Sequence, residues 1–204
     1  MSDTFLDKAY NTAGIAATRD LYSRWAASYE AEVSQNGYAT PRRCAEALQA
    51  VTLDFDAPIL DFGCGTGLSG LALSMAGFST IDGIDLTQGM LDRAGEKQLY
   101  RNLSLSDPDV PFPVRRGDYA AISAIGVIGA GAAPIDVFDM LLGALGTGGK
   151  FVLSFNDSTL KTPAFEKRLY ASVSSKSAIL LSENYGDHLP GINMKSKVYV
   201  LEKT

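Results

Sequence analysis

The sequence contains little of what marks secreted or membrane-spanning proteins. It has only two cysteines, Cys44 and Cys64, which is too few for a disulfide framework, and Cys64 lies within a glycine-rich turn that a disulfide would obstruct. No apolar run approaches the roughly 18 residues that a membrane-spanning helix needs. The N-terminal stretch carries the acids Asp3 and Asp7 and no apolar segment of the signal-peptide type. We therefore expect a cytoplasmic protein with reduced cysteines and no membrane partner.

Basic residues are also scarce. The chain has 18 Lys and Arg against 23 Asp and Glu, a formal net charge of -5, and no run of Lys or Arg. This balance argues against a large nucleic-acid-binding surface, so we expect no nucleic-acid partner, and we expect no bound metal. The length of 204 residues and the hydrophobic content of 46% suit one globular domain that spans residues 1–204.

The first 50 residues are expected to form a helical cap. Tyr22, Trp25 and Tyr29 fall at helical spacing and share one face. Pro41 then opens a second helix, because proline is tolerated in the first turn, where its missing N–H has no partner anyway.

Residues 58–204 alternate between strand and helix patterns and are expected to form an α/β core. Such alternation predicts a Rossmann-like, doubly wound sheet that is mostly parallel, with helices on both faces. The last two of the seven strands have no helix between them, so the last strand should run antiparallel. Ligands bind such sheets beyond the carboxyl ends of the strands, which places Asp61, Asp85, Asp107, Ile125 and Asn156 along one rim. The expected strands cover residues 59–61, 79–85, 103–106, 120–125, 150–155, 178–183 and 197–202, and the expected helices cover 68–76, 88–99, 134–145 and 163–172.

The most informative stretch is a glycine-rich turn between the first strand and the following helix. Gly65, Gly67 and Gly70 satisfy the pattern G-x-G-x-x-G, and Asp85 follows Gly65 by 20 residues. This arrangement is a candidate dinucleotide-binding site, with Asp85 on the ribose hydroxyls. Glycines at such a turn let a cofactor lie directly against the backbone.

A second interpretation of the same turn comes from Asp61, two positions before Gly63. A carboxylate beside the turn would repel a pyrophosphate, whereas it would favour the ammonium of S-adenosylmethionine. Asp85 serves both interpretations, because it would accept hydrogen bonds from ribose hydroxyls in either. The turn alone therefore leaves an oxidoreductase using NAD(P) and a methyltransferase as alternatives.

Several motifs together resemble those of class I S-adenosylmethionine-dependent methyltransferases. Residues 59–67 read Ile-Leu-Asp-Phe-Gly-Cys-Gly-Thr-Gly, and residues 81–91 read Ile-Asp-Gly-Ile-Asp-Leu-Thr-Gln-Gly-Met-Leu, similar to the family's first two motifs. Ser106-Asp107, residues 119–128 and residues 145–154 resemble the motifs of the third, fourth and fifth strands, with Thr147 in place of the usual proline. Residues 22–30, together with 89–91 and 99–101, are similar to the Williams–Beuren-region methyltransferase subgroup.

The resemblance implies S-adenosylmethionine as the cofactor and assigns residues to it. The clamp on the methionine end would come from Asp61 and the glycine turn, the ribose contact from Asp85 and the adenine contact from Asp107. Where the family often has a histidine after the fourth strand, this chain has Gly129-Ala130-Gly131. The expected cofactor-binding residues are Trp25, Tyr29, Asp61, Gly63, Cys64, Gly65, Gly67, Asp85, Leu86, Met90, Asp107 and Ile125.

No catalytic base stands out. His188, the single histidine, is a weak candidate for a general base at the rim, and we favour a solvated loop histidine instead. The stretch Asn156-Asp157-Ser158-Thr159 differs from the Asn/Asp-Pro-Pro-Tyr motif of enzymes that methylate DNA bases or glutamine. Because 204 residues leave little room for a separate recognition domain, we expect a small-molecule methyl acceptor. The alternatives are a non-catalytic module that binds S-adenosylmethionine and, less favoured, the oxidoreductase.

Overall fold

The computed structural model describes residues 15–26, 28–107, 110, 112–129 and 131–204. Its centre is a seven-stranded sheet with the order β3-β2-β1-β4-β5-β7-β6. All pairings from β3 across to β5 are parallel, whereas β7 pairs antiparallel with both β5 and β6. The sheet predicted from the sequence, with its reversed last strand, is therefore confirmed. The strands are β1 (Ile59–Phe62), β2 (Ile81–Asp85), β3 (Asn102–Leu105), β4 (Ala121–Ala124), β5 (Lys150–Asn156), β6 (Ala178–Leu189) and β7 (Met194–Lys203).

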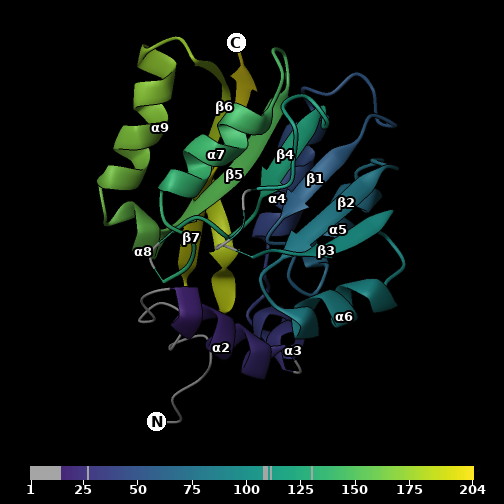
Figure 1. Cartoon of the computed structure of the whole chain (residues 1–204). Helices are drawn as coiled ribbons and strands as arrows, with labels where there is room; N and C mark the ends of the chain where they lie inside the picture. The colour runs from purple at the N-terminus through teal and green to yellow at the C-terminus, as the bar shows by residue number, and fades with distance from the viewer. Residues whose placement is uncertain (1–14, 27, 108–109, 111, 130) are drawn as a thin grey trace.

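Helices cover both faces of this sheet (Figure 1). On one face, α7 (Asp136–Ala144) and α9 (Ala164–Ser174) pack against a core that contains Phe138 and Phe151. On the other face, α4 (Thr40–Gln49) and α5 (Leu68–Met75) enclose a second core around Leu48. The helix α6 (Gln88–Glu96) lies against β2 and β3, and the short α8 (Asp157–Leu160) follows β5. Burial of these apolar side chains on both faces drives the layered arrangement.

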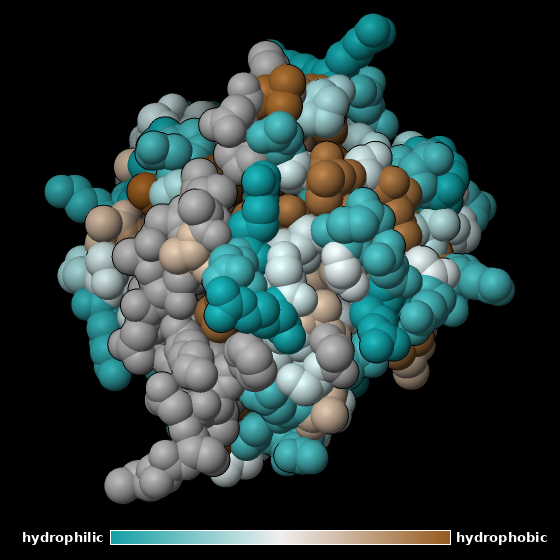
Figure 2. Space-filling view, turned by 60° about the horizontal axis from the view of Figure 1, so that its bottom comes forward, coloured by the Kyte–Doolittle hydropathy of each residue, from teal (hydrophilic) through white to brown (hydrophobic). Residues whose placement is uncertain are grey.

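Two short helices, α2 (Ile15–Trp25) and α3 (Tyr29–Gln35), lie beyond the carboxyl ends of the parallel strands (Figure 1). Figure 2 turns this end toward the viewer, and hydrophilic residues cover much of the surface visible there. Trp25 ends α2 and Tyr29 begins α3, so the predicted aromatic stripe spans two helices rather than one. The Trp25 and Tyr29 rings still pack together, with their centroids 4.8 Å apart.

The hairpin of β6 and β7 corrects the predicted end of the sheet. The sequence predicts strands over 178–183 and 197–202 with a loop between them, but pairing continues to Leu189 and resumes at Met194, leaving only the 3-10 turn η1 (Pro190–Ile192) and Asn193. Asn184, Gly186 and Asp187 are typical turn formers, which explains the wrong prediction. Arg43 of α4 fixes this stretch, because its guanidinium donates to the backbone oxygens of Asn184 and Asp187, each at 2.8 Å.

Within the part of the chain that the structure describes, none of the helices has both the length and the apolar character needed to cross a bilayer.

Candidate functional site

A cavity of about 560 Å³ opens at the carboxyl ends of the parallel strands. Its walls come from the ends of β1, β2 and β3, from the segment after β4 and from α2, α3 and α7. This is the rim where the sequence places a ligand. The predicted site residues that line it are Tyr29, Gly63, Gly65, Asp85, Leu86, Met90, Asp107 and Ile125.

The glycine turn after β1 is shaped by left-handed backbone. Gly63 has φ +68°, Gly65 has φ +53°, and both conformations favour glycine. A Cβ on Gly63 would lie 2.4 Å from Cγ2 of Val127, so the turn packs tightly against the segment after β4. A Cβ on Gly65 would meet no atom within 4 Å, so this glycine borders open space in the cavity. The turn therefore offers its backbone to a ligand at Gly65.

Asp85 ends β2 and holds the turn in place. Its Oδ2 accepts a hydrogen bond from the Gly65 backbone N–H at 2.9 Å, and its Oδ1 accepts one from the Thr87 N–H at the same distance. Burial raises the pKa of the Asp85 carboxyl above its usual range. The Thr87 hydroxyl also donates to Oδ1, at 3.3 Å. Because a carboxylate has about four lone-pair positions, one position remains for a hydroxyl group of a ligand.

Asp61, which was expected to contact the cofactor, lies away from both cavities. It is fully buried beneath the turn. Its carboxylate accepts hydrogen bonds from three hydroxyl groups, and burial raises the pKa of the carboxyl. Asp61 therefore fastens the turn to the core and presents no surface to a ligand. The donors are Ser69 Oγ at 2.6 Å, Tyr100 OH at 2.8 Å and Ser123 Oγ at 2.8 Å.

Two further predicted contacts, Cys64 and Gly67, line neither of the two cavities. The Cys64 thiol is buried, and burial raises its pKa well above the usual range, so it stays protonated and inert. Gly67 precedes α5 with φ +93°, and a Cβ there would crowd Ala94 and Lys97. Both residues shape the turn from behind, through packing against α6 and β2.

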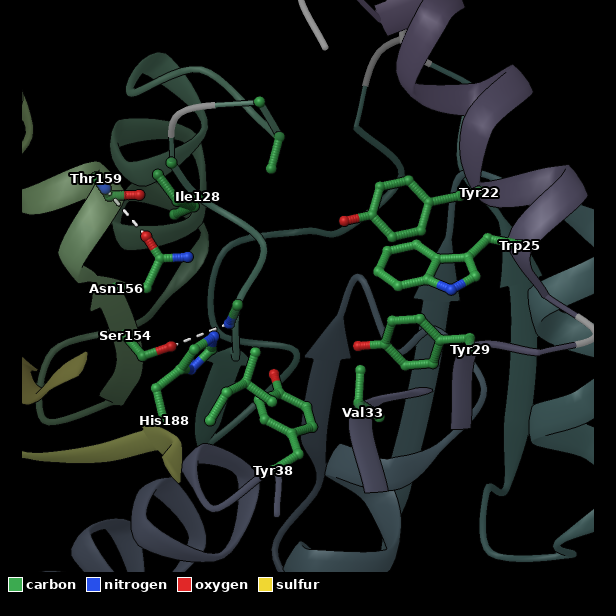
Figure 3. A pocket seen from close by; sticks show the side chains of 15 residues that line it. Tyr22, Trp25, Tyr29, Val33, Tyr38, Ile128, Ser154, Asn156, Thr159 and His188 are labelled. Atoms are coloured by element: carbon green, nitrogen blue, oxygen red, sulfur yellow. Dashed lines mark hydrogen bonds between the residues drawn. The ribbon is translucent and has the colours of Figure 1, made fainter. Parts of the chain in front are cut away.

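A smaller pocket of about 50 Å³ adjoins the large cavity. Tyr22, Tyr29, Gly126 and Ala132 border both spaces. In Figure 3, Tyr22, Trp25 and Tyr29 form one side of this pocket, while Asn156 and His188 lie on the opposite side. Trp25, predicted as a cofactor contact, lines only this smaller pocket and is almost completely buried.

His188 differs from the predicted solvated loop residue. It lies near the end of β6, only 4% exposed, and its Nδ1 is 2.8 Å from Thr40 Oγ1. Burial lowers the pKa of its imidazole to about 4. At neutral pH the ring is therefore uncharged, and its low basicity makes it a poor general base.

Several cavity residues were not among those expected at the site. The apolar ones lie at strand ends, in connections or on α7, where nothing in the sequence marks them as ligand contacts. Tyr22 belongs to the aromatic stripe that was predicted to share one face of a helix. The residues are Tyr22, Tyr38, Phe62, Leu105, Phe112, Val127, Val137 and Met140.

Comparisons with curated proteins agree on one activity class. Methyltransferase-like protein 27 of Homo sapiens is 33% identical over 136 residues, which is 65% of this chain and 56% of that protein. The 18S rRNA (guanine(1575)-N(7))-methyltransferase of Saccharomyces cerevisiae is 34% identical over 120 residues, 53% of this chain and 44% of that protein. The matches thus span about half the length of these relatives.

Solved structures share the fold at low identity. The complex between the Haloferax volcanii Trm112 methyltransferase activator and a putative methyltransferase matches with a TM-score of 0.69 at 13% identity, covering 92% of this chain and 98% of that one. Geranyl diphosphate methyltransferase in complex with SAM matches with a TM-score of 0.62 at 13% identity, covering 87% and 91%. A family model described as a methyltransferase domain matches residues 36–193, more than half of the chain. The chain therefore belongs to the methyltransferase domain family.

Proposed function

We propose that the chain is an S-adenosylmethionine-dependent methyltransferase that acts on a small molecule. The observation that carries the proposal is the rim cavity, where the open glycine turn, Asp85 and Asp107 line one space in a chain of this family. The same cavity would be needed for the competing interpretation with a nicotinamide dinucleotide. Membership of a methyltransferase family favours the methyl donor.

The cavity residues fit S-adenosylmethionine. Open space at Gly65 admits the methionine part against the backbone, and the Asp85 carboxylate would accept a ribose hydroxyl. Asp107 lines the same cavity and would take the amino group of the adenine. The apolar side chains of Leu86 and Met90 would cover the rings and the ribose.

Methyl transfer requires mainly that the reacting groups are held in the correct positions. The cofactor supplies a methyl group that its sulfonium has already activated for in-line transfer. Alignment of reacting groups contributes up to about 7–11 kcal/mol in favourable cases. Tyr22 and Tyr29 border both cavities, so they would separate the cofactor from an acceptor held in the smaller pocket. Their rings would keep water from the reacting atoms.

RNA is the competing acceptor, because three relatives are named as 18S rRNA methyltransferases, one of them as a probable one. Proteins hold nucleic-acid phosphates largely through Lys and Arg. Among the described residues that line the two cavities, there is neither Lys nor Arg. This lining supports a small molecule rather than a polynucleotide.

Titration calorimetry tests the cofactor. We expect S-adenosylmethionine and S-adenosylhomocysteine to bind and NADH and NADPH not to bind. Binding of a nicotinamide cofactor alone would contradict the proposal. Methyl release is then measured over a panel of metabolites and, separately, RNA, since turnover with any acceptor excludes a purely non-catalytic binding module.

A further inference from the structure

Lys97 contacts two walls of the large cavity from behind. This inference rests on the proposed function, because it concerns how the cavity would hold S-adenosylmethionine. One wall is the glycine turn, which lines the cavity through Gly63 and Gly65, and another comes from α2 and α3, through Tyr22 and Tyr29. We call α2 and α3 the cap. A ligand that lies between the cap and the turn binds tightly only if their separation is fixed in advance.

The Lys97 side chain holds the glycine turn. Its Nζ donates a hydrogen bond to the backbone oxygen of Thr66 at 2.8 Å. Thr66 is buried and directly follows Gly65, which borders the cavity. The Lys97 stem lies close to Gly67, where an added Cβ would be 3.2 Å from the Lys97 Cδ. Glycine at position 67 therefore leaves room for Lys97 to reach the turn.

The same ammonium group also contacts the cap. Lys97 Nζ forms an ion pair with Oε1 of Glu30, which lies in the first turn of α3, at 2.5 Å. Glu30 directly follows Tyr29, which lines both cavities. An ammonium has three N–H donors, so Lys97 can bind Glu30 and Thr66 at the same time. One side chain thus joins the cap to the glycine turn.

The helix α6 supports the cap at two places. It follows β2, which ends at Asp85 in the large cavity, and Lys97 comes directly after its last residue. Near the start of α6, the end of α2 packs closely, since a Cβ on Gly89 would lie 3.6 Å from the Cβ of Ala26. Figure 1 shows α6 beside the cap. The cap therefore contacts α6 near both ends of this helix.

A neighbouring ion pair on α6 provides a contrast. Arg93 and Glu96 belong to the same helix, and their side chains are 47% and 64% exposed, so this pair joins no separate elements. The Lys97 side chain is only 22% exposed, which weakens screening by solvent and salt. It also connects three elements that are distant in the sequence. We therefore expect Lys97, and not the exposed pair, to influence what binds between the cap and the turn.

We propose that Lys97 is a positioning residue for S-adenosylmethionine, which holds Glu30 of the cap and Thr66 of the glycine turn together. These two contacts set the separation between Tyr29 and Gly65, which both line the large cavity. Lys97 lines neither cavity, so it acts on the cofactor through these contacts. Without the ammonium, the cap and the turn are free to separate, and the cofactor binds more weakly.

Calorimetry with S-adenosylhomocysteine tests the proposal. Lys97→Met keeps most of the stem and removes the ammonium, and we expect the affinity to fall by about tenfold, since two charge-assisted hydrogen bonds are lost. Glu30→Gln removes the charge of one partner and should lower it by about threefold. The double variant should bind as Lys97→Met does, because Glu30 has already lost its partner there. Additive losses, or unchanged affinity in Lys97→Met, would overturn the proposal.

Two further variants show whether the loss is specific. Lys97→Arg keeps a cation that can donate to a carboxylate and a carbonyl, so it should recover most of the affinity. Glu96→Gln breaks the exposed ion pair with Arg93 and should bind S-adenosylhomocysteine as the wild type does. If Lys97→Arg binds as weakly as Lys97→Met, or if Glu96→Gln binds equally weakly, the positive charge at position 97 has no special role and the proposal fails.

The cap contains its own spectroscopic probe. Trp25 is the single tryptophan, is 1% exposed at the end of α2, and packs against the ring of Tyr29. Without ligand, we expect acrylamide to quench its fluorescence more strongly in Lys97→Met than in the wild type, because the cap is less firmly held. Urea unfolding identifies conditions in which both proteins are folded. Weaker ligand binding with unchanged quenching would mean that Lys97 acts on the turn alone, which would contradict the coupling.

The outcomes separate this inference from the proposed function. If the wild type binds S-adenosylhomocysteine and Lys97→Met binds it equally well, only the role of Lys97 is wrong. If the wild type does not bind S-adenosylhomocysteine, the proposed function itself fails.

Discussion

The Asp85 carboxylate accepts a hydrogen bond from the Gly65 backbone N–H, with 2.9 Å between Oδ2 and the nitrogen. The contact joins the end of β2 to the turn after β1, and both residues line the large cavity. We expect Asp85→Ala to weaken binding of S-adenosylhomocysteine by about 100-fold or more, because it removes hydrogen bonds to a charged group and loosens the turn. Calorimetry measures the change. As a control, Asp92→Ala removes an exposed carboxylate from α6 and should bind S-adenosylhomocysteine as the wild type does. Unchanged affinity in Asp85→Ala would contradict the assignment of Asp85 to the ribose.

Two glycines of the turn should respond differently to alanine. Gly63→Ala would place its Cβ 2.4 Å from Val127 and is expected to destabilise the fold. The Cβ of Gly65→Ala would meet no atom within 4 Å, so the loss in the free energy of unfolding should be only the strain of a left-handed conformation, about 1–2 kcal/mol. Its methyl group would instead project into the cavity. We expect Gly63→Ala to show the larger loss in urea unfolding and Gly65→Ala to fold but bind S-adenosylhomocysteine weakly. Tight binding by Gly65→Ala would place the ligand elsewhere.

Much of the fold follows from patterns along the chain. Alternating strands and helices, and the missing crossover before the last strand, were enough to predict the sheet and its reversed strand. The same reasoning brought Gly65, Asp85 and Asp107 to one cavity, because the carboxyl ends of parallel strands meet at a single edge.

Sequence patterns did not show features that distant residues decide. Asp61 was assigned to the cofactor because a carboxylate beside the glycine turn suits the ammonium of S-adenosylmethionine. Its actual partners Tyr100 and Ser123 lie 39 and 62 positions away, and no local pattern indicates that their hydroxyls converge on it. The stretch before His188 contains turn-forming residues, yet cross-strand pairing with β7 and the guanidinium of Arg43 keep it extended.

Replacement of Asp61 should lower the stability of the fold more than it lowers cofactor affinity. Asp61→Ala leaves three hydroxyl donors, two of them on buried serines, without this acceptor, and we expect a loss of about 3 kcal/mol in the free energy of unfolding. Ser123→Ala removes one of these donors and should cost about 1 kcal/mol. Urea unfolding measures both. Cofactor affinity, measured where the variant remains folded, should fall less than in Asp85→Ala. A larger fall with little change in stability would restore Asp61 as a ligand contact.

Acid should destabilise the protein through His188. Burial lowers the pKa of its imidazole to about 4 in the folded protein, against about 6.5 in the unfolded chain. Between these values the unfolded state binds a proton that the folded state does not, so stability falls as the pH drops below about 6.5 and the loss is complete near pH 4. The full effect is about 3 kcal/mol, since one pKa unit corresponds to about 1.4 kcal/mol.

His188→Asn isolates this contribution. The Asn side chain can keep a hydrogen bond to Thr40 in place of Nδ1, but it does not titrate. Because the chain has one histidine, carboxylates that titrate in the same range contribute equally to both proteins and cancel in the difference. We expect urea unfolding free energies of the wild type and the variant to differ by a constant amount above pH 7. Below about pH 6.5 this difference should change, because the free energy of unfolding falls more steeply for the wild type than for the variant. Parallel curves down to about pH 4.5 would mean that the His188 ring takes up a proton freely in the folded protein, and the lowered pKa would be refuted.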